Sequence, residues 1–166
     1  TNSGLSNAIS FSESGAFGTG VYQLTATNLP AGTVVHFRSW VSNSAGRGVT
    51  TESHFLTRPP APVIMASTNV QPLQFDANWS SSMSATGYWI SAAYDDATFG
   101  ATSYVPGYSN RWVGSVLTVP VTNLLKAATS VYIRVSGKNA TGTGGWSENG
   151  ITLIKSTFTN VSSALT

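Results

Sequence analysis

Residues 27–48 read TNLPAGTVVHFRSWVSNSAGRG, and residues 122–144 read TNLLKAATSVYIRVSGKNATGTG. Both stretches contain Thr-Asn-Leu, a polar bend, a run in which apolar and polar residues alternate, and Asn-x-x-Gly. Alternation with a period of two is typical of a half-buried β-strand, and a Gly-containing turn after it indicates a hairpin. The pattern recurs after about one domain's length, which predicts two β-units of one kind in tandem.

Alternation also predicts which side chains of each stretch face a core. In the second stretch, Val131, Ile133 and Val135 are expected to point inward and Leu124 to fill the corner of the bend. The first stretch repeats this arrangement, with Val35, Phe37 and Ser39 inward, His36, Arg38 and Trp40 outward, and Leu29 at the corner.

The proline-rich sequence TRPPAPV at 57–63 marks a boundary, because prolines exclude a central strand and stiffen a short linker. No stretch carries the apolar spacing of a helix. Before the boundary, the predicted strands are Val21–Ala26, Val35–Val41 and Val49–Thr57, with Ala8–Ser12 as one further candidate. After it, they are Val63–Ala66, Leu73–Trp79, Gly87–Tyr94, Tyr104–Val113, Val116–Val121, Val131–Gly137 and Trp146–Ile154. About seven short strands in roughly a hundred residues indicate an antiparallel sandwich.

Three segments resemble the fibronectin type III module, especially the versions common in large secreted bacterial proteins. FDANWSSSMSATGYWISAAYDD (75–96) is similar to its second and third strands, YVPGYSNRWVG (104–114) to its next edge strand and loop, and GKNATGTGGWSENGITL (137–153) to its final hairpin. The resemblance implies an all-β fold of tandem immunoglobulin-like (fibronectin type III) antiparallel sandwiches, the first one incomplete. Core positions would include Phe75, Ala77 and Trp79, followed by Ala85, Gly87, Tyr88 and Ile90.

The predicted organisation is the C-terminal part of one such domain at 1–57, a complete domain at 58–156, and a linker or strand-donating tail at 157–166. A sandwich needs about seven strands, and residues 1–20 offer at most one. Tyr22, Leu24, Val35 and Phe37 would then form an apolar face with no opposing sheet. Two explanations are open: the chain is a fragment of a longer protein, which we favour, or a neighbouring copy supplies strands, with STFTNVSSALT (156–166) as the donor.

Composition excludes several classes of function. Only 8% of residues are charged, and the eight Lys and Arg residues are scattered, which argues against a nucleic-acid partner. No apolar run approaches the length of a membrane span, so membrane insertion is not predicted. The chain has no Cys, which removes disulfides and thiolate chemistry. The charge-poor surface, rich in Ser, Thr and Asn, favours a secreted or cell-surface protein.

Residues that could carry chemistry are few, so the sequence predicts no enzyme, no cofactor and no metal site. His36 and His54 are expected to face each other across a hairpin, two ligands where a metal site needs three or four. Asp95 and Asp96 indicate a solvated turn. No nucleophile elbow, phosphate-binding loop or metal-binding helix motif is present.

Exposed aromatic residues give the remaining binding hypothesis. Trp89 is expected to face outward on the third strand of the second domain, and Tyr132 and Arg134 on the sixth, which pairs with the third in the family that the chain resembles. Arg134 would stack between the two rings as a cation–π contact. This face is interpreted first as a stabilising stripe and second as a surface that binds a glycan or a protein.

The predicted function is a non-catalytic spacer or surface module of a secreted or cell-surface bacterial protein. Its partners would be other domains of the parent chain or neighbouring copies of itself. One alternative is a subunit of an extracellular filament assembled by β-strand complementation between subunits. The other is an adhesin module that binds a glycan or a cell-surface protein through Trp89, Tyr132 and Arg134.

Overall fold

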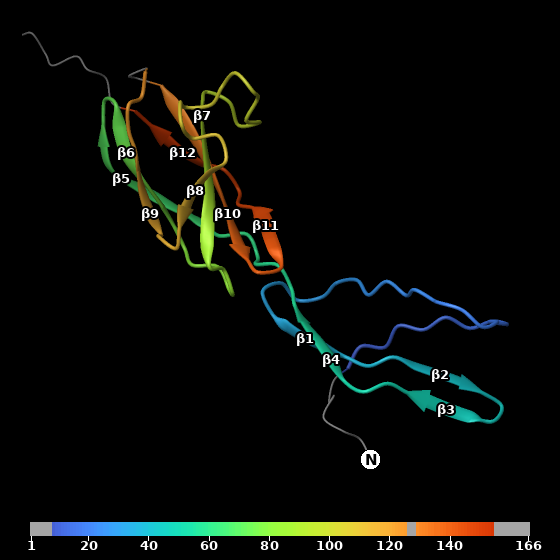
Figure 1. The fold of residues 1–166 in the computed structure, drawn as a ribbon. Helices are drawn as coiled ribbons and strands as arrows, with labels where there is room; N and C mark the ends of the chain where they lie inside the picture. Colours follow the sequence, from blue (N-terminus) through green and yellow to red (C-terminus); the bar gives the residue numbers. More distant parts are fainter. Residues whose placement is uncertain (1–7, 126–128, 155–166) are drawn as a thin grey trace, which may run out of the picture.

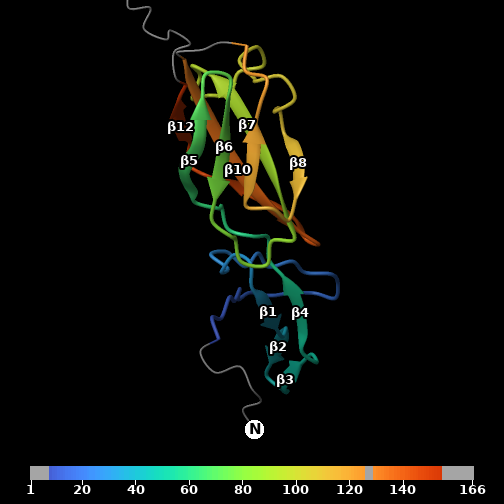
Figure 2. The ribbon, with the colours of Figure 1, turned by 90° about the vertical axis from the view of Figure 1, so that its left-hand side faces the viewer.

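The structure is a computed structural model that describes residues 8–125 and 129–154 (Figure 1). These residues are all-β, and their sheets are antiparallel. A small β-unit before the proline-rich linker and a larger sandwich after it lie end to end (Figures 1 and 2). No helix in the described ranges is long and apolar enough to cross a membrane.

The larger unit is a sandwich of two sheets. One sheet has the order β5 (Ile64–Gln71), β6 (Gln74–Trp79) and β9 (Thr118–Val121). In the other, β11 (Gly142–Trp146) and β12 (Gly150–Leu153) both pair with β10 (Ser130–Asn139), followed by β7 (Gly87–Tyr94) and β8 (Arg111–Gly114). The pairing of β7 with β10 runs from Gly87↔Lys138 to Tyr94↔Val131, which confirms the predicted contact of the third and sixth strands.

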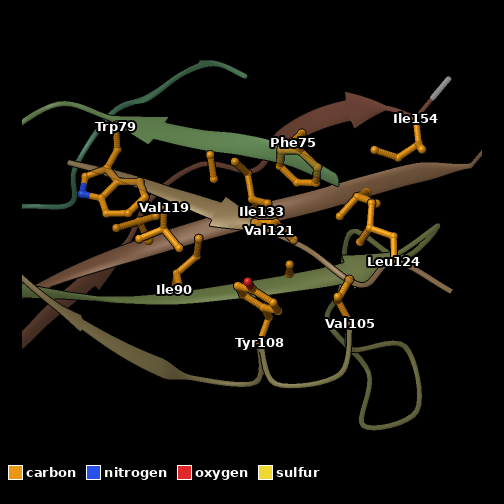
Figure 3. Close-up of a cluster of buried hydrophobic side chains, with 14 of the residues drawn as sticks. Phe75, Trp79, Ile90, Val105, Tyr108, Val119, Val121, Leu124, Ile133 and Ile154 are labelled. Carbon is orange, nitrogen blue, oxygen red and sulfur yellow. The ribbon is translucent and has the colours of Figure 1, made fainter. Parts of the chain in front are cut away.

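The core of the sandwich lies between the two sheets, as the alternation predicts (Figure 3). Trp79 and Phe75 of β6 are each 1% exposed, and Trp79 meets Tyr88 edge to face at 5.8 Å between ring centroids. The predicted inward positions Ala77, Ile90, Val131, Ile133 and Val135 are likewise buried. Leu124 fills its corner and is 2% exposed. Each large apolar side chain buried here contributes about 1.5–3 kcal/mol to stability.

Two predicted strands of the sandwich are shorter than expected. Of Tyr104–Val113, only an isolated bridge from Tyr104 to Ala93 and the start of β8 are β-structure. The chain between them turns inward, because Tyr108 is buried and donates its hydroxyl hydrogen to the Pro120 carbonyl at 2.7 Å. Trp146–Ile154 is divided into β11 and β12 by residues 147–149, where Ser147 binds Val135 through its amide hydrogen at 2.8 Å and its hydroxyl oxygen accepts the Val135 amide hydrogen at 2.9 Å.

The smaller unit is one long hairpin with an interruption. β1 (Val34–Phe37) pairs with β4 (Ser53–Leu56), and β2 (Trp40–Asn43) pairs with β3 (Gly46–Val49). The predicted continuous strand Val35–Val41 is therefore wrong, since the ladder breaks at 38–39. The turn is also tighter than predicted, because Asn43 pairs directly with Gly46.

The predicted strands Val21–Ala26 and Ala8–Ser12 are absent, and both segments are irregular. A strand needs a neighbour to complete its hydrogen bonds, and the described residues offer these segments none. Gly32 is the one buried residue among described residues 8–57, and Tyr22 and Phe37 are 57% and 44% exposed. Among the described residues, no second layer therefore covers the apolar side of this unit. The domain limits stay a prediction, and 157–166 lies outside the described residues.

Candidate functional site

Arg134 on β10 lies between two aromatic rings, but they are not the predicted ones. Its guanidinium carbon is 4.2 Å from the Phe99 ring centroid and 4.6 Å from that of Trp146. It also donates a hydrogen bond of 3.4 Å to the Tyr104 hydroxyl. Phe99 is 6% exposed and belongs to the loop after β7, so Arg134 fastens this loop to the outer face of the sheet. The prediction that Arg134 stacks between Trp89 and Tyr132 is therefore wrong, because the rings beside it are those of Phe99 and Trp146.

Trp89 instead pairs across strands with Trp112 of β8, with ring centroids 5.2 Å apart. The Trp112 ring lies over Gly87, where an added Cβ would be 2.4 Å from the ring, and Lys138 Nζ is 5.7 Å from its centroid. Trp112 is 44% exposed. Sequence reasoning assigned Trp112 to an edge strand without placing it on the binding face. The register of β7 and β8, in which Trp112 lies opposite Trp89, places it on that face.

Tyr132 lies farther along the same face of β10, in register with Ala93 and Ile151. Around it the surface is apolar, since Ile151 and Leu153 of β12 are 59% and 72% exposed. Trp89, Arg134 and Tyr132 thus share a sheet face but belong to three separate groups of contacts. Whether this face binds a ligand stays a prediction.

We expect Arg134→Ala to destabilise the sandwich by about 1–3 kcal/mol, because a partly desolvated cation–π contact is worth up to about 2 kcal/mol and two rings lose their partner. Urea unfolding followed by circular dichroism measures this. Arg111→Ala is the matched control, since Arg111 is exposed and contacts one ring, that of Tyr108. Equal losses in the two variants would contradict the fastening role of Arg134.

The junction between the two units is a second cluster of polar contacts, and several side-chain hydrogen bonds meet there. It is built on Asn139, which ends β10 and is 3% exposed. Its Nδ2 donates to the Thr57 carbonyl at 2.8 Å and to the Ser84 hydroxyl at 3.1 Å. Its Oδ1 accepts the amide hydrogens of Thr141 and Gly142 at 2.9 and 3.2 Å. One side chain therefore shapes the β10–β11 turn and holds the end of the smaller unit.

Further bonds join the units at the same place. Thr141 donates its hydroxyl hydrogen to the Leu56 carbonyl at 2.7 Å, next to the carbonyl that Asn139 binds. The Gly32 amide donates to the Arg58 carbonyl at 2.7 Å, which extends the β1–β4 pairing to the start of the linker. A groove of about 650 Å³ lies along this junction, with Leu29 and Phe55 on one side and Thr143 and Gly145 on the other.

The linker itself is packed against the sandwich. Pro59 and Pro62 are buried, and Ser82 donates its hydroxyl hydrogen to the Pro60 carbonyl at 2.6 Å. Gly144 on β11 is needed for this contact, because an added Cβ there would lie 2.1 Å from the Pro59 carbonyl oxygen. The sequence predicted a stiff linker, and the structure also shows how the linker is held.

The remaining polar candidates have structural roles. His36 and His54 face each other at 5.5 Å between ring centroids, as predicted, and His36 Nδ1 is 2.9 Å from the Glu52 carboxylate. The described residues contain no group of three or more His, Cys, Asp or Glu suited to a metal ion. Asp96 caps its own turn, accepting hydrogen bonds from Thr98 and Gly100, and these bonds hold the pKa of its carboxyl far below the usual value.

No protein-family model and no curated protein matches this chain. Among solved structures, it is 19% identical to the FN5 domain of Drosophila Lar, covering 59% of this chain and 98% of that one at a TM-score of 0.46. The chicken CNTN1 FN1–FN3 structure is 19% identical, with 78% and 45% covered and a TM-score of 0.45. An FN3 domain of human collagen XX is 18% identical, with 57% and 90% covered and a TM-score of 0.43. At these sequence identities and TM-scores, no function can be inferred for this chain from the solved structures. The fold assignment rests on the strand order and the core described above.

Proposed function

We propose that the chain is a non-catalytic structural module that holds successive β-units in a fixed orientation within a secreted or cell-surface protein. The observation that carries the proposal is the junction, where Asn139 and Thr141 bind two consecutive carbonyls of the preceding unit. A flexible linker between independent domains is exposed and makes few contacts, whereas here Asn139 and two prolines of the linker are buried. Such a module separates and orients the parts that it connects.

We expect Asn139→Ala to free the two units from each other. The substitution removes the hydrogen bond that this side chain makes across the junction and leaves the Thr57 carbonyl without its donor, a loss of about 1–3 kcal/mol. Backbone 15N relaxation would then give different tumbling times for β1–β4 and for the sandwich, whereas the unchanged chain gives one common time.

Asn149→Ala is the matched control for this experiment. Asn149 is exposed, and its Nδ2 binds the Ala97 carbonyl within the sandwich. One common tumbling time in both variants would contradict the fixed junction, provided that the sandwich signals show both variants folded.

A filament subunit is a second candidate function, favoured by the uncovered apolar face of the smaller unit. Its large apolar side chains Tyr22, Leu24, Phe37 and Phe55 are 43–57% exposed. Strands from a neighbouring copy would cover this face by β-strand complementation. Electron microscopy separates the two functions: ordered fibres that disappear when residues 156–166 are deleted support the filament, and single particles support the spacer.

An adhesin is the third candidate. Trp89 and Trp112 with Lys138 offer aromatic surface beside a cation, the combination that carbohydrate and protein partners use. Because Arg134 already makes cation–π contacts with Phe99 and Trp146, the ligand would bind mainly to Trp89 and Trp112. Loss of glycan binding in Trp89→Ala, with an unchanged melting temperature, would support this candidate.

A further inference from the structure

The β10–β11 turn that holds the linker has a counterpart in the smaller unit, the β2–β3 turn. In the repeated sequence pattern, Asn43, Gly46 and Gly48 correspond to Asn139, Gly142 and Gly144. In each turn the Asn Oδ1 accepts two amide hydrogens, at 2.9 and 3.2 Å in both cases. In each, the Asn pairs directly with the first of the two glycines, whose φ is 146° in one turn and 142° in the other.

The two turns differ in what covers them. Asn139 is buried under the Thr57 carbonyl, whereas Asn43 is exposed and its Nδ2 has no hydrogen-bond partner among the described residues. Gly144 lies against the Pro59 carbonyl, whereas an added Cβ at Gly48 would meet only Val41, at 3.6 Å. Val41 is itself 73% exposed.

The position of each turn in the molecule is also equivalent. The β10–β11 turn is at the end of the sandwich that faces the smaller unit, and the β2–β3 turn is at the end of the smaller unit that faces away from the sandwich (Figure 1). A unit added in series at that end would place its connecting segment over the β2–β3 turn.

We propose that the β2–β3 turn is a docking site for the proline-containing linker of a preceding unit of the same kind. Asn43 Nδ2 would donate to a carbonyl of this linker, and Gly48 would accept the close approach of the carbonyl two residues later, as Gly144 does at Pro59. This inference rests on the proposed function, because it extends the fixed junction to a second one. A proline-containing segment suits this site, because the bonds that Asn139 and Ser82 make to the known linker use only carbonyl groups, which proline retains.

The first test asks whether the β2–β3 turn sequence can hold a linker. Ala140→Ser, Thr141→Ala and Thr143→Arg together convert the β10–β11 turn NATGTG into the sequence NSAGRG of the other turn. We expect this triple variant to keep one common tumbling time and to match the single variant Thr141→Ala, which already lacks the bond to Leu56. A triple variant whose units tumble separately while those of Thr141→Ala do not would overturn the proposal.

The second test uses a linker peptide, HFLTRPPAP (residues 54–62), added to the 15N-labelled full chain. A short tether supplies an effective concentration in the millimolar range, so a dissociation constant of up to a few millimolar suffices for docking in series. We expect saturable amide shifts at Asn43, Gly46 and Gly48, abolished by Asn43→Ala and retained in Ser44→Ala. No saturation by about 10 mM, equal shifts in Asn43→Ala, or the absence of a β2–β3 hairpin in the free chain would each overturn the proposal.

The two proposals fail separately. Independent tumbling of the units in the unchanged chain contradicts the fixed junction whatever the peptide does. A common tumbling time together with no peptide binding leaves the fixed junction in place and removes only the second docking site.

Discussion

Trp79→Ala is expected to remove a large fraction of the free energy of unfolding of the sandwich. Trp79 is 1% exposed and packs edge to face on Tyr88 in the core. Removing a buried Trp costs about 3–5 kcal/mol, because it loses the transfer free energy and leaves a cavity. A domain of this size is stable by only about 5–15 kcal/mol. Urea unfolding by circular dichroism gives the loss directly.

Trp112→Ala is the matched control for this prediction. It removes the same side chain from the outer face of the same sandwich, where Trp112 is 44% exposed. We expect a loss of about 1 kcal/mol or less from cross-strand contact with Trp89. A loss in Trp79→Ala no greater than in this control would mean that the two sheets do not enclose the core described here.

Gly144→Val is expected to displace the linker from β11 and to break the junction. A Cβ at this position would lie 2.1 Å from the carbonyl oxygen of Pro59, and backbone on both sides leaves no flexible side chain to yield. The expected cost is about 1–3 kcal/mol, as for other overpacked sites. Hydrogen exchange of the Gly32 amide, which donates to Arg58 next to the displaced Pro59, should become much faster.

Gly145→Val tests whether faster exchange of the Gly32 amide is specific to a side chain at position 144. The neighbouring glycine is exposed, and its added Cβ would be 4.0 Å from the nearest atom, the Cβ of Ala61. We expect the Gly32 amide to exchange at the unsubstituted rate in this variant. Similar acceleration in both variants would show that β11 tolerates no side chain there and that linker displacement is not the cause.

The core of the sandwich could be predicted because burial imposes a period of two on each strand. Val131, Ile133 and Val135 were placed correctly from alternation alone. Strand ends were less predictable, because they depend on tertiary contacts. Tyr108 ends its predicted strand by turning into the core to reach Pro120, and nothing in the local pattern distinguishes that from an exposed edge. Val21–Ala26 has the pattern of a strand but no neighbour to pair with.

The candidate sites were harder to predict, because their residues come from distant parts of the chain. Arg134 was expected to stack on aromatic residues of its own sheet, yet Phe99 comes from a loop in which it adopts a positive φ of 58°. The junction had a signal in the sequence, the repeated Asn-x-x-Gly-x-Gly, which was interpreted only as a turn. Its second role follows from the position of the linker over that turn, which only the fold supplies.

The central claim, that the junction fixes the two units relative to each other, is tested most directly by a distance between them. The chain has no Cys, so Thr51→Cys and Ser115→Cys give two exposed spin-label sites, one in each unit. Double electron–electron resonance should give a single narrow distance distribution, and Asn139→Ala in the same background should broaden it severalfold. A distribution in the unsubstituted junction as broad as in Asn139→Ala would contradict the account.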